Sequence, residues 1–182
     1  MTVILILVVL FIVWVILMYN SLIRMRVQVN NAWSQIDVQL KRRHDLIPNL
    51  VNAVRGYMKY EQETLNRVME ARAKAVSATS VTAKAEAEGE LSGVLSRLFA
   101  LFENYPDLKA NQNVLALQEE LTTTENQISF TRQHYNDSVM RYNTKTQVFP
   151  SNIIASVFAF KLFEFFKAPE EEKAVPKVDL SF

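Results

Sequence analysis

The sequence contains no cysteine and only three glycines in 182 residues. Without cysteine the chain forms no disulfide, offers no thiolate to a metal and has no cysteine nucleophile. Three glycines are too few to build a phosphate-binding loop or a dinucleotide-binding turn together with a set of tight hairpins. The 20 Lys and Arg nearly balance the 19 Asp and Glu, so the strongly basic surface of a nucleic-acid-binding domain is excluded and we expect no nucleic-acid partner.

One long stretch, Val3–Tyr19, carries no charge, glycine or proline. Leu22 and Ile23 extend it, and residues 3–23 span about 32 Å as a helix, enough to cross a hydrocarbon core of about 30 Å. We therefore predict a transmembrane anchor at residues 1–23 that contacts the lipid bilayer through residues 3–23. A cleaved signal peptide is the alternative, but such peptides carry a positive segment before the apolar run and a small-residue cleavage site after it. This sequence has neither feature.

Positive charge follows the anchor at Arg24 and Arg26 and again at residues 41–43, whereas no Lys or Arg precedes it. Short flanking segments rich in Lys and Arg stay on the cytoplasmic side of a membrane. The pattern places the body of the chain in the cytoplasm.

Residues 24–149 are rich in helix formers and are predicted to be a helical bundle domain. Turn residues gather only at Ser77–Thr82, Asn104–Asn111 and Phe149–Asn152. Between the breaks, apolar residues recur at alternating steps of three and four, as in the a and d positions of a heptad. The first frame runs from Val29 through Trp33, Ile36, Leu40, Arg43, Ile47, Leu50, Val54, Tyr57 and Thr64 to Ala75. The second runs from Leu91 through Val94, Leu98 and Leu101 to Tyr105. The third runs from Val114 through Leu121, Thr124, Ile128 and Tyr135 to Tyr142.

This pattern predicts an all-α fold, with an antiparallel bundle of long helices behind the anchor. The number of helices depends on Pro48. The heptad frame passes through Pro48 unbroken, as it would in a continuous kinked helix. Proline also removes a helical hydrogen bond, and Asp45 could cap a new helix after a turn. The bundle therefore has three long helices, or four if the chain turns at Pro48.

Residues suited to catalysis or metal binding are scarce and scattered. His44 and His134 lie far apart in the sequence and have no further ligand at metal-binding spacing, so a structural or surface role is favoured. Glu86, Glu88 and Glu90 come early in the second bundle helix, where they favour its dipole, and we see no partner for them. We expect no enzyme activity, no cofactor and no metal.

Two polar sets and one aromatic segment are candidate surfaces for a partner or for fixing helix register. The polar candidates are Arg43, His44 and Asp45 near Pro48, and Arg132, Asn136 and Arg141 on the last long helix; the alternative is a solvated face with ion pairs. Arg43 is the best candidate because it occupies a core position of the frame.

The aromatic segment, residues 150–167, carries Phe160, Phe163, Phe165 and Phe166. It could close the end of the bundle, dip into the membrane interface or dock a partner. We expect Ile153, Ile154 and Val157 to contact the body, and Phe160 through Phe166 to make an external contact. Residues 168–182 read as a flexible acidic tail.

Long motifs now make a family resemblance visible. Asn30–Ala75 opens with NNAWSQIDVQLKRRHDLIPNLVNAV, Phe102–Asn152 contains NYPDLKANQNVLALQEELTTTENQISFTRQHYNDSVMRYN, and the chain ends in PKVDLSF. The sequence closely resembles the LemA family of bacterial membrane proteins, and the resemblance covers nearly all of the chain from Asn30 onward. The segment VFAFKLFEFF after FPSN departs from the family pattern.

The resemblance implies a single-pass protein of the bacterial inner or plasma membrane with a helical-bundle domain and no established enzymatic activity. It also implies a membrane-protein partner, such as a membrane metalloprotease, or self-assembly. Two functions follow as hypotheses. The first is a scaffold or adaptor for membrane proteins, and the second is an unrecognised membrane-tethered hydrolase or sensor domain, which would need a concave polar pocket.

Overall fold

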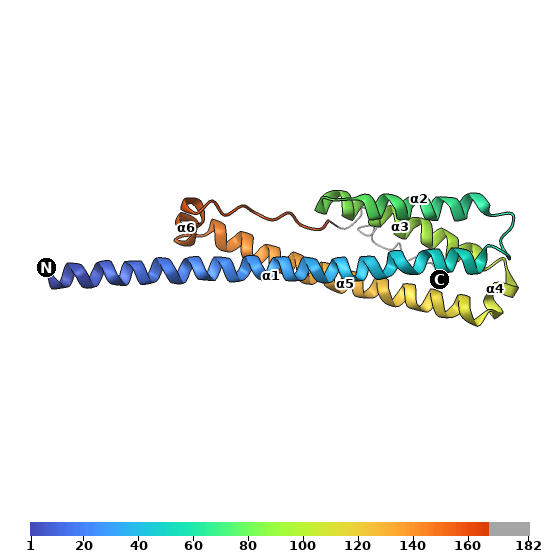
Figure 1. Cartoon of the computed structure of the whole chain (residues 1–182), viewed down its shortest axis with the longest axis horizontal. Helices are drawn as coiled ribbons and strands as arrows, with labels where there is room; N and C mark the ends of the chain where they lie inside the picture. Colours follow the sequence, from blue (N-terminus) through green and yellow to red (C-terminus); the bar gives the residue numbers. More distant parts are fainter. Residues whose placement is uncertain (168–182) are drawn as a thin grey trace, which may run out of the picture. The chain divides into compact units, whose positions relative to one another are not determined.

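The computed structural model describes residues 1–167, and the acidic tail expected at residues 168–182 lies outside them. The described residues form six helices and no strand (Figure 1). The helices are α1 (Thr2–Val54), α2 (Gln62–Ser77), α3 (Val81–Phe102), α4 (Pro106–Ala110), α5 (Gln112–Gln147) and α6 (Ser151–Val157). The all-α prediction with a long apolar N-terminal helix is confirmed.

The chain divides into two compact units. Unit 1 comprises residues 1–40 and 126–165, and unit 2 comprises residues 41–125 together with Phe166 and Lys167. The long helices α1 and α5 each contribute to both units. The predicted divisions at residues 23 and 149 rest on composition and stay a prediction.

In unit 1, the first part of α1 runs antiparallel to the second part of α5. Leu22 clusters with Ile154 just beyond α5, whereas the ring of Trp33 lies 5.3 Å from that of Tyr135. The predicted frame is buried on both helices, because its members recur on one face of each helix. The buried members in this unit are Val29, Ile36, Leu40, Ile128, Tyr135 and Tyr142.

The segment after α6 returns along α5, and side chains of α5 form hydrogen bonds with the backbone of this segment. Asn143 donates from Nδ2 to the carbonyl of Phe163 (2.9 Å) and accepts at Oδ1 from the Phe163 amide (3.0 Å). The hydroxyls of Tyr135 and Tyr142 donate to the carbonyls of Glu164 (2.8 Å) and Lys161 (3.0 Å). These bonds satisfy polar groups of a backbone that forms no helix of its own.

In unit 2, α2 and α3 form an antiparallel hairpin across the break at residues 78–80. Ser80 caps α3 by accepting from the amide of Ala83 (3.1 Å), and Asn111 caps α5 by accepting from the amide of Asn113 (3.0 Å). One core joins the end of α1 to α2, α3, α4 and the start of α5. Its largest fully buried members are Ile47, Leu50, Met58, Leu65, Leu91, Leu98 and Leu108.

The helix α1 continues through Pro48 and ends at Val54. The chain turns at residues 55–61 instead of at Pro48, which decides between the two alternatives for this proline. The frame expected to run unbroken to Ala75 is therefore interrupted: Tyr57 is exposed, and Leu65 takes the buried position predicted for Thr64.

Candidate functional site

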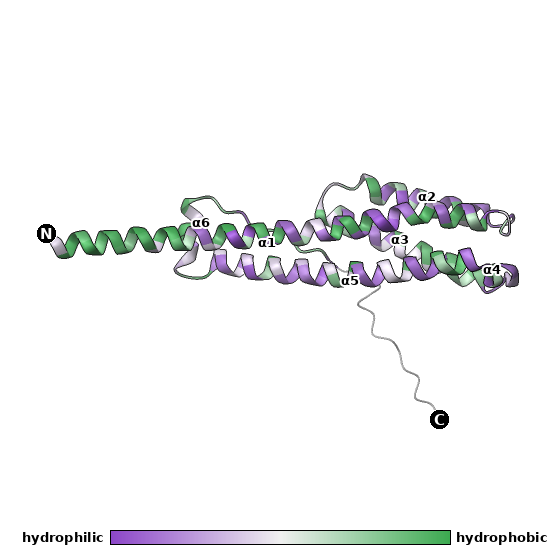
Figure 2. Cartoon of the chain, turned by 60° about the horizontal axis from the view of Figure 1, so that its bottom comes forward, coloured by the Kyte–Doolittle hydropathy of each residue, from purple (hydrophilic) through white to green (hydrophobic). Residues whose placement is uncertain are grey.

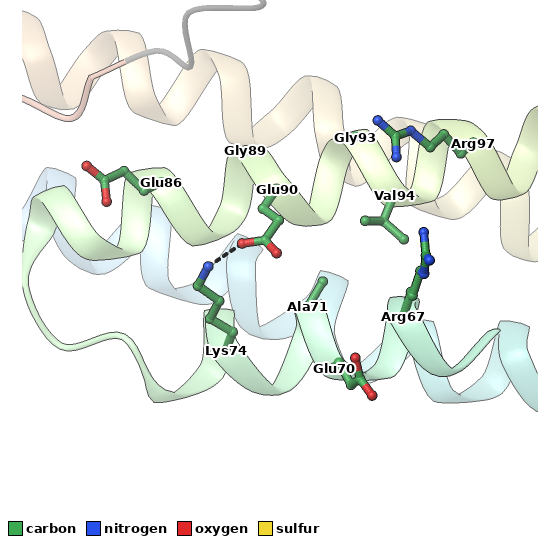
Figure 3. A pocket seen from close by; sticks show the side chains of 10 residues that line it. All are labelled: Arg67, Glu70, Ala71, Lys74, Glu86, Gly89, Glu90, Gly93, Val94 and Arg97. Atoms are coloured by element: carbon green, nitrogen blue, oxygen red, sulfur yellow. Dashed lines mark hydrogen bonds and ion pairs between the residues drawn. The ribbon is translucent and has the colours of Figure 1, made fainter. Parts of the chain in front are cut away.

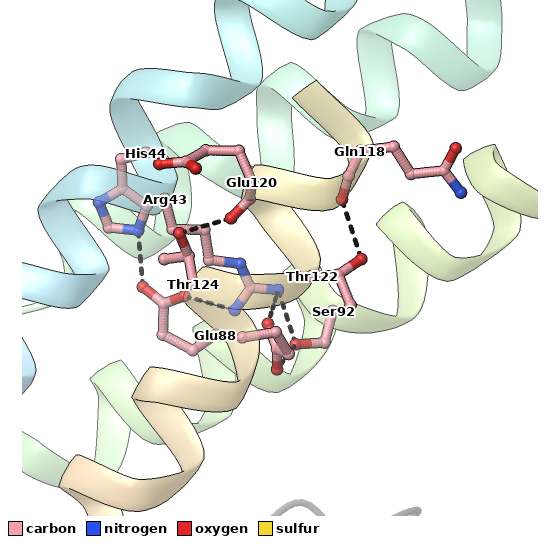
Figure 4. A network of polar contacts seen from close by, with 9 residues as sticks. Arg43, His44, Glu88, Ser92, Gln118, Glu120, Thr122 and Thr124 are labelled. Carbon is pink, nitrogen blue, oxygen red and sulfur yellow. Dashed lines mark hydrogen bonds and ion pairs between the residues drawn. The ribbon is translucent and has the colours of Figure 1, made fainter. Parts of the chain in front are cut away.

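A cluster of charged side chains lies in the interior of unit 2, where α1, α3 and α5 meet. Arg43 donates from Nη1 to Glu88 Oε2 (3.2 Å) and from Nη2 to Ser92 Oγ (2.7 Å). Its Nη2 also lies 3.0 Å from Glu125 Oε2. On the other side of the Glu88 carboxylate, His44 Nε2 lies 2.6 Å from Oε1 (Figure 4). The guanidinium is thus shared by three partners from two helices.

The charged groups at the centre of this cluster are buried inside unit 2. The side chains of Arg43 and Glu88 are only 3% and 5% exposed, and that of Glu125 is 43% exposed. Charges removed from water are tolerated only where paired and hydrogen-bonded. Ser92 helps by donating its hydroxyl to Glu125 Oε1 (3.2 Å). The cluster therefore joins α1 to α3 and α5 through buried polar contacts.

Glu88 was not predicted as a site residue because the frame predicted for α3, with Val94 and Leu101, differs from the buried one, with Leu95 and Phe102. The expectation that it had no partner is wrong. The buried residues Leu91, Leu95, Leu98 and Phe102 step by four, three and four, and one further step of three back from Leu91 reaches Glu88. A glutamate on that frame, facing an arginine on the frame of α1, is the signal that could have predicted the pair.

The remaining candidate of the first polar set, Asp45, lies at the surface of unit 2, as does its neighbour Arg42. Asp45 pairs with Lys41 at 2.5 Å, both exposed, and the hydrogen bond from Lys41 lowers the pKa of Asp45 below its ordinary value. Arg42 pairs with Glu120 of α5. Exposed pairs of this kind contribute little to stability.

The second polar set belongs to unit 1. Arg132 and Asn136 are half-buried and take part in contacts there, and Arg141 is exposed. His134 is exposed on α5. The two histidines therefore fall in different units, His44 buried against Glu88 in unit 2 and His134 at the surface of unit 1.

The aromatic candidates divide between buried and exposed positions. Phe163 packs edge-to-face on Tyr142, with ring centroids 5.1 Å apart, and Phe160 lies 5.8 Å from Tyr19. Phe165 keeps 44% of its surface, whereas Phe166 is 2% exposed. The expected external contact is therefore wrong for Phe166. Of the residues expected to contact the body, Ile154 is buried, while Ile153 and Val157 are exposed.

Unit 2 also carries a groove of about 810 Å³ between α2 and α3. It is lined by Arg67, Glu70, Ala71 and Lys74 of α2 and by Glu86, Gly89, Glu90, Gly93, Val94 and Arg97 of α3. Arg67 and Arg97 lie at one end beside Val94, and an ion pair between Lys74 and Glu90 crosses the groove (Figure 3). Gly89 and Gly93 lie one turn apart and leave their part of the α3 face without side chains.

Several charges of this groove are unmatched. Within residues 1–167, Glu70, Glu86 and Arg97 hold no ion pair, and Arg67 pairs only with Glu63 of its own helix. None of the lining residues was named as a candidate from the sequence. Surface charges at helical spacing are common in sequences. Only the packing of α2 beside α3 brings the lining residues together around one groove.

The N-terminal part of α1 is long and apolar enough to cross a membrane, and none of that stretch is buried inside the structure. Joined to a helical bundle, it defines a membrane-associated helical protein. The family model described as "LemA family" matches residues 32–180. The chain belongs to the LemA family, as its motifs indicated.

Similar proteins come from several bacteria. The chain is 29% identical over 155 residues to the protein LemA of Metamycoplasma hominis, covering 85% of this chain and 71% of that protein. It is 24% identical over 186 residues to the magnetosome protein MamQ 2 of Paramagnetospirillum magneticum, with 88% and 68% covered. It is 22% identical over 182 residues to the magnetosome protein MamQ of Magnetospirillum gryphiswaldense, with 86% and 67% covered. None of these names is that of an enzyme.

Proposed function

We propose that this protein is a non-catalytic, membrane-anchored scaffold whose α2–α3 groove docks a helix of another membrane protein. The observation that carries the proposal is the groove with three charges of both signs, Glu70, Glu86 and Arg97, that hold no ion pair within residues 1–167. Complementary charges give an interface its specificity and its register. The groove therefore suits a helix that carries acidic and basic residues one or two turns apart.

The buried charges of unit 2 support a binding role over catalysis. A catalytic group must reach a substrate or a water molecule. Arg43, His44 and Glu88 instead make their polar contacts inside the protein, with one another and, for Arg43, also with Ser92 and Glu125. The groove is lined by Arg, Lys, Glu, Gly, Ala and Val, side chains that suit recognition of a charged surface.

The proposed setting is the inner or plasma membrane of a bacterium, with the bundle in the cytoplasm. Arg24 and Arg26 directly follow the apolar stretch of α1, and positive charge at a helix end favours the cytoplasmic side. The proposed partner is a membrane protein, and the resemblance to the family makes a membrane metalloprotease one class to look for.

Charge reversal in the groove tests the proposal. The full-length chain and its Arg97→Glu variant are purified from the producing cells in mild detergent, and the membrane proteins that remain attached are quantified. Because like charges placed together cost several kcal/mol, we expect Arg97→Glu to lose a defined partner by about tenfold or more.

The matched control is Arg55→Glu, an exposed arginine of the same unit that lies outside the groove lining. The control should keep the partner, and the partner used as bait should recover this chain. Equal recovery with both variants would overturn the assignment of the groove. Recovery of only a second copy of this chain would replace the partner with self-association.

A further inference from the structure

We propose that α6, with the residues that flank it, is a second membrane element, which lies in the bilayer interface beside the spanning part of α1. Unit 1 would then touch lipid at two places, the anchor and α6. The proposal depends on α1 crossing the membrane and not on the scaffold role, so either can fail without the other.

The helix α6 contacts α1 on the apolar stretch that is long enough to cross a membrane. Ile154 and Ala155 of α6 are buried in a cluster with Leu22 of α1. Packed against that cluster are Trp14, Val15, Met18 and Tyr19 of α1, and Phe160. Figures 1 and 2 both show α6 beside this stretch, and Figure 2 shows the hydrophobic part of α1 reaching it.

The depth of these contacts follows from helix geometry. With Arg24 at the headgroups, Met18 lies about 9 Å and Trp14 about 15 Å further along the helix, at 1.5 Å per residue. Both positions fall within a hydrocarbon layer of about 30 Å. Side chains packed on these residues must lie at a similar depth, at or below the membrane interface.

The helix α6 and the residues that flank it expose several large apolar side chains. Phe149 and Val157 keep 80% and 72% of their surface, and Ile153, Phe158 and Leu162 are also exposed. Ile153 and Val157 lie one turn apart and share a face of α6. A patch of this kind is costly in water, and its continuity with the spanning helix points to lipid as the group that covers it.

Backbone groups at both ends of α6 find partners within the chain, as they must in a segment near hydrocarbon. At its end, the amide of Phe160 donates to the carbonyl of Ala155 (2.9 Å), and the amide of Ala159 donates to the carbonyl of Ser156 (3.2 Å). This is a Schellman arrangement, with Ala159 in the left-handed region at φ 52°. At its start, the amides of Asn152 and Ile153 donate to the carbonyls of Val148 (2.9 Å) and Pro150 (3.3 Å).

Charged and polar groups at the edge of the patch match the headgroup layer. The guanidinium of Arg26 lies 5.7 Å from the centre of the Phe160 ring, and Lys161 is exposed beside it. Asn152 and Ser156 lie one turn apart on another face of α6. The segment thus has the mixed faces of an interfacial helix, with basic groups where anionic lipids lie.

Depth-dependent quenching in the full-length protein tests this proposal. The chain has no cysteine, so a single introduced cysteine carries a fluorescent label at one known position. Val157→Cys and Ile153→Cys are reconstituted in phosphatidylcholine–phosphatidylglycerol vesicles, with or without a nitroxide on the lipid acyl chains. We expect the acyl-chain nitroxide to remove most of the fluorescence at both positions, whereas iodide in the water has little effect.

Two exposed control positions bracket the result. Leu10→Cys in the anchor should respond as a lipid-facing site, and Phe130→Cys on α5 should respond to iodide and not to the nitroxide. Labels at positions 153 and 157 that follow the Phe130→Cys control would overturn the proposal. Labels that neither agent quenches would overturn it too, because protein would then cover the patch.

Discussion

Arg43 shows how one buried side chain can organise a helical unit. Its guanidinium joins Glu88, Ser92 and Glu125 across the helix interfaces of unit 2. Replacing a buried ion pair by apolar residues is often neutral, but removing one partner leaves the other charge uncompensated. The consequence is a strong dependence of stability on Glu88 in particular.

We therefore expect Glu88→Ala to lower the free energy of unfolding by about 3 kcal/mol or more. The double variant Arg43→Met with Glu88→Leu should lose much less, because no buried charge is left alone. Denaturant unfolding of the full chain in detergent, followed by circular dichroism, measures both. Glu90→Ala, which removes an exposed pair on the same helix, is the control and should cost less than about 1 kcal/mol. A Glu88→Ala variant as stable as this control would contradict the account.

Tyr135 gives a pH dependence with a definite sign. Burial, and to a smaller extent the nearby Glu164 carboxylate, raises the pKa of Tyr135 to about 12. In the unfolded chain the pKa is about 10, so above that pH the unfolded state has released a proton that the folded state still holds. The contribution of Tyr135 to the free energy of unfolding is therefore complete below pH about 10 and is lost as the pH rises to about 12.

Thermal unfolding measured across this alkaline range should show the fall, and Tyr135→Phe should flatten it. The variant also loses the hydrogen bond to the Glu164 carbonyl, so its stability at neutral pH is compared separately. An identical slope in the variant would assign the alkaline loss to other groups.

At the residue scale, the sequence predicted Arg43 as a core charge but not its partner. Position on a frame is visible in the sequence, and so Arg43 could be singled out. The partner, Glu88, could not be predicted because two neighbouring frames of α3 were possible. Only the packing of α3 against the other helices decides which frame faces inward. The groove depends on the approach of two helices, which no spacing within either helix encodes.

Pro48 is accommodated at the element scale by a side chain from another helix. A proline inside a helix leaves the carbonyl four residues earlier without its amide partner. In α1 that carbonyl belongs to His44, and Arg72 of α2 donates to it from Nε at 2.6 Å. The continuous helix through Pro48 is thus stabilised by the packing of α2.

A double-mutant cycle tests this accommodation. Arg72→Ala alone should lower the free energy of unfolding by about 1.5–3 kcal/mol, as for other hydrogen bonds to charged groups. In a Pro48→Ala background the backbone amide returns, and we expect Arg72→Ala to cost about 1 kcal/mol less. Denaturant midpoints of the four proteins give the coupling. Additive effects would show that Arg72 does not substitute for the missing amide.

The long frames of α1 and α5 were predicted well because their periodicity persists over many turns. The turn at residues 55–61 was not predicted, because helix-forming residues surround it and Gly56 is its only strong turn signal. Met58 is fully buried within that turn, so tertiary packing fixes a break that local propensity does not. The short helix α6 follows the FPSN turn that the sequence did indicate.

At the scale of the whole molecule, the orientation of the anchor decides on which side of the membrane the bundle lies. Arg24 and Arg26 predict that a tag placed after Phe182 is protected from protease in intact spheroplasts and cleaved once they are permeabilised. A cytoplasmic marker protein is the control for leakage. Removal of the tag from the outside of intact spheroplasts would reverse the proposed orientation.

The central claim is that the α2–α3 groove holds another membrane protein, and cross-linking in native membranes measures it most directly. Because the chain has no cysteine, Glu86→Cys can carry a photo-activated cross-linker at the groove, and Glu119→Cys, an exposed glutamate of α5 in the same unit, serves as the matched control. We predict that Glu86→Cys forms one covalent adduct with a membrane protein and that Glu119→Cys does not. Adducts at Glu86→Cys that are absent, or that match those of Glu119→Cys, would contradict the claim.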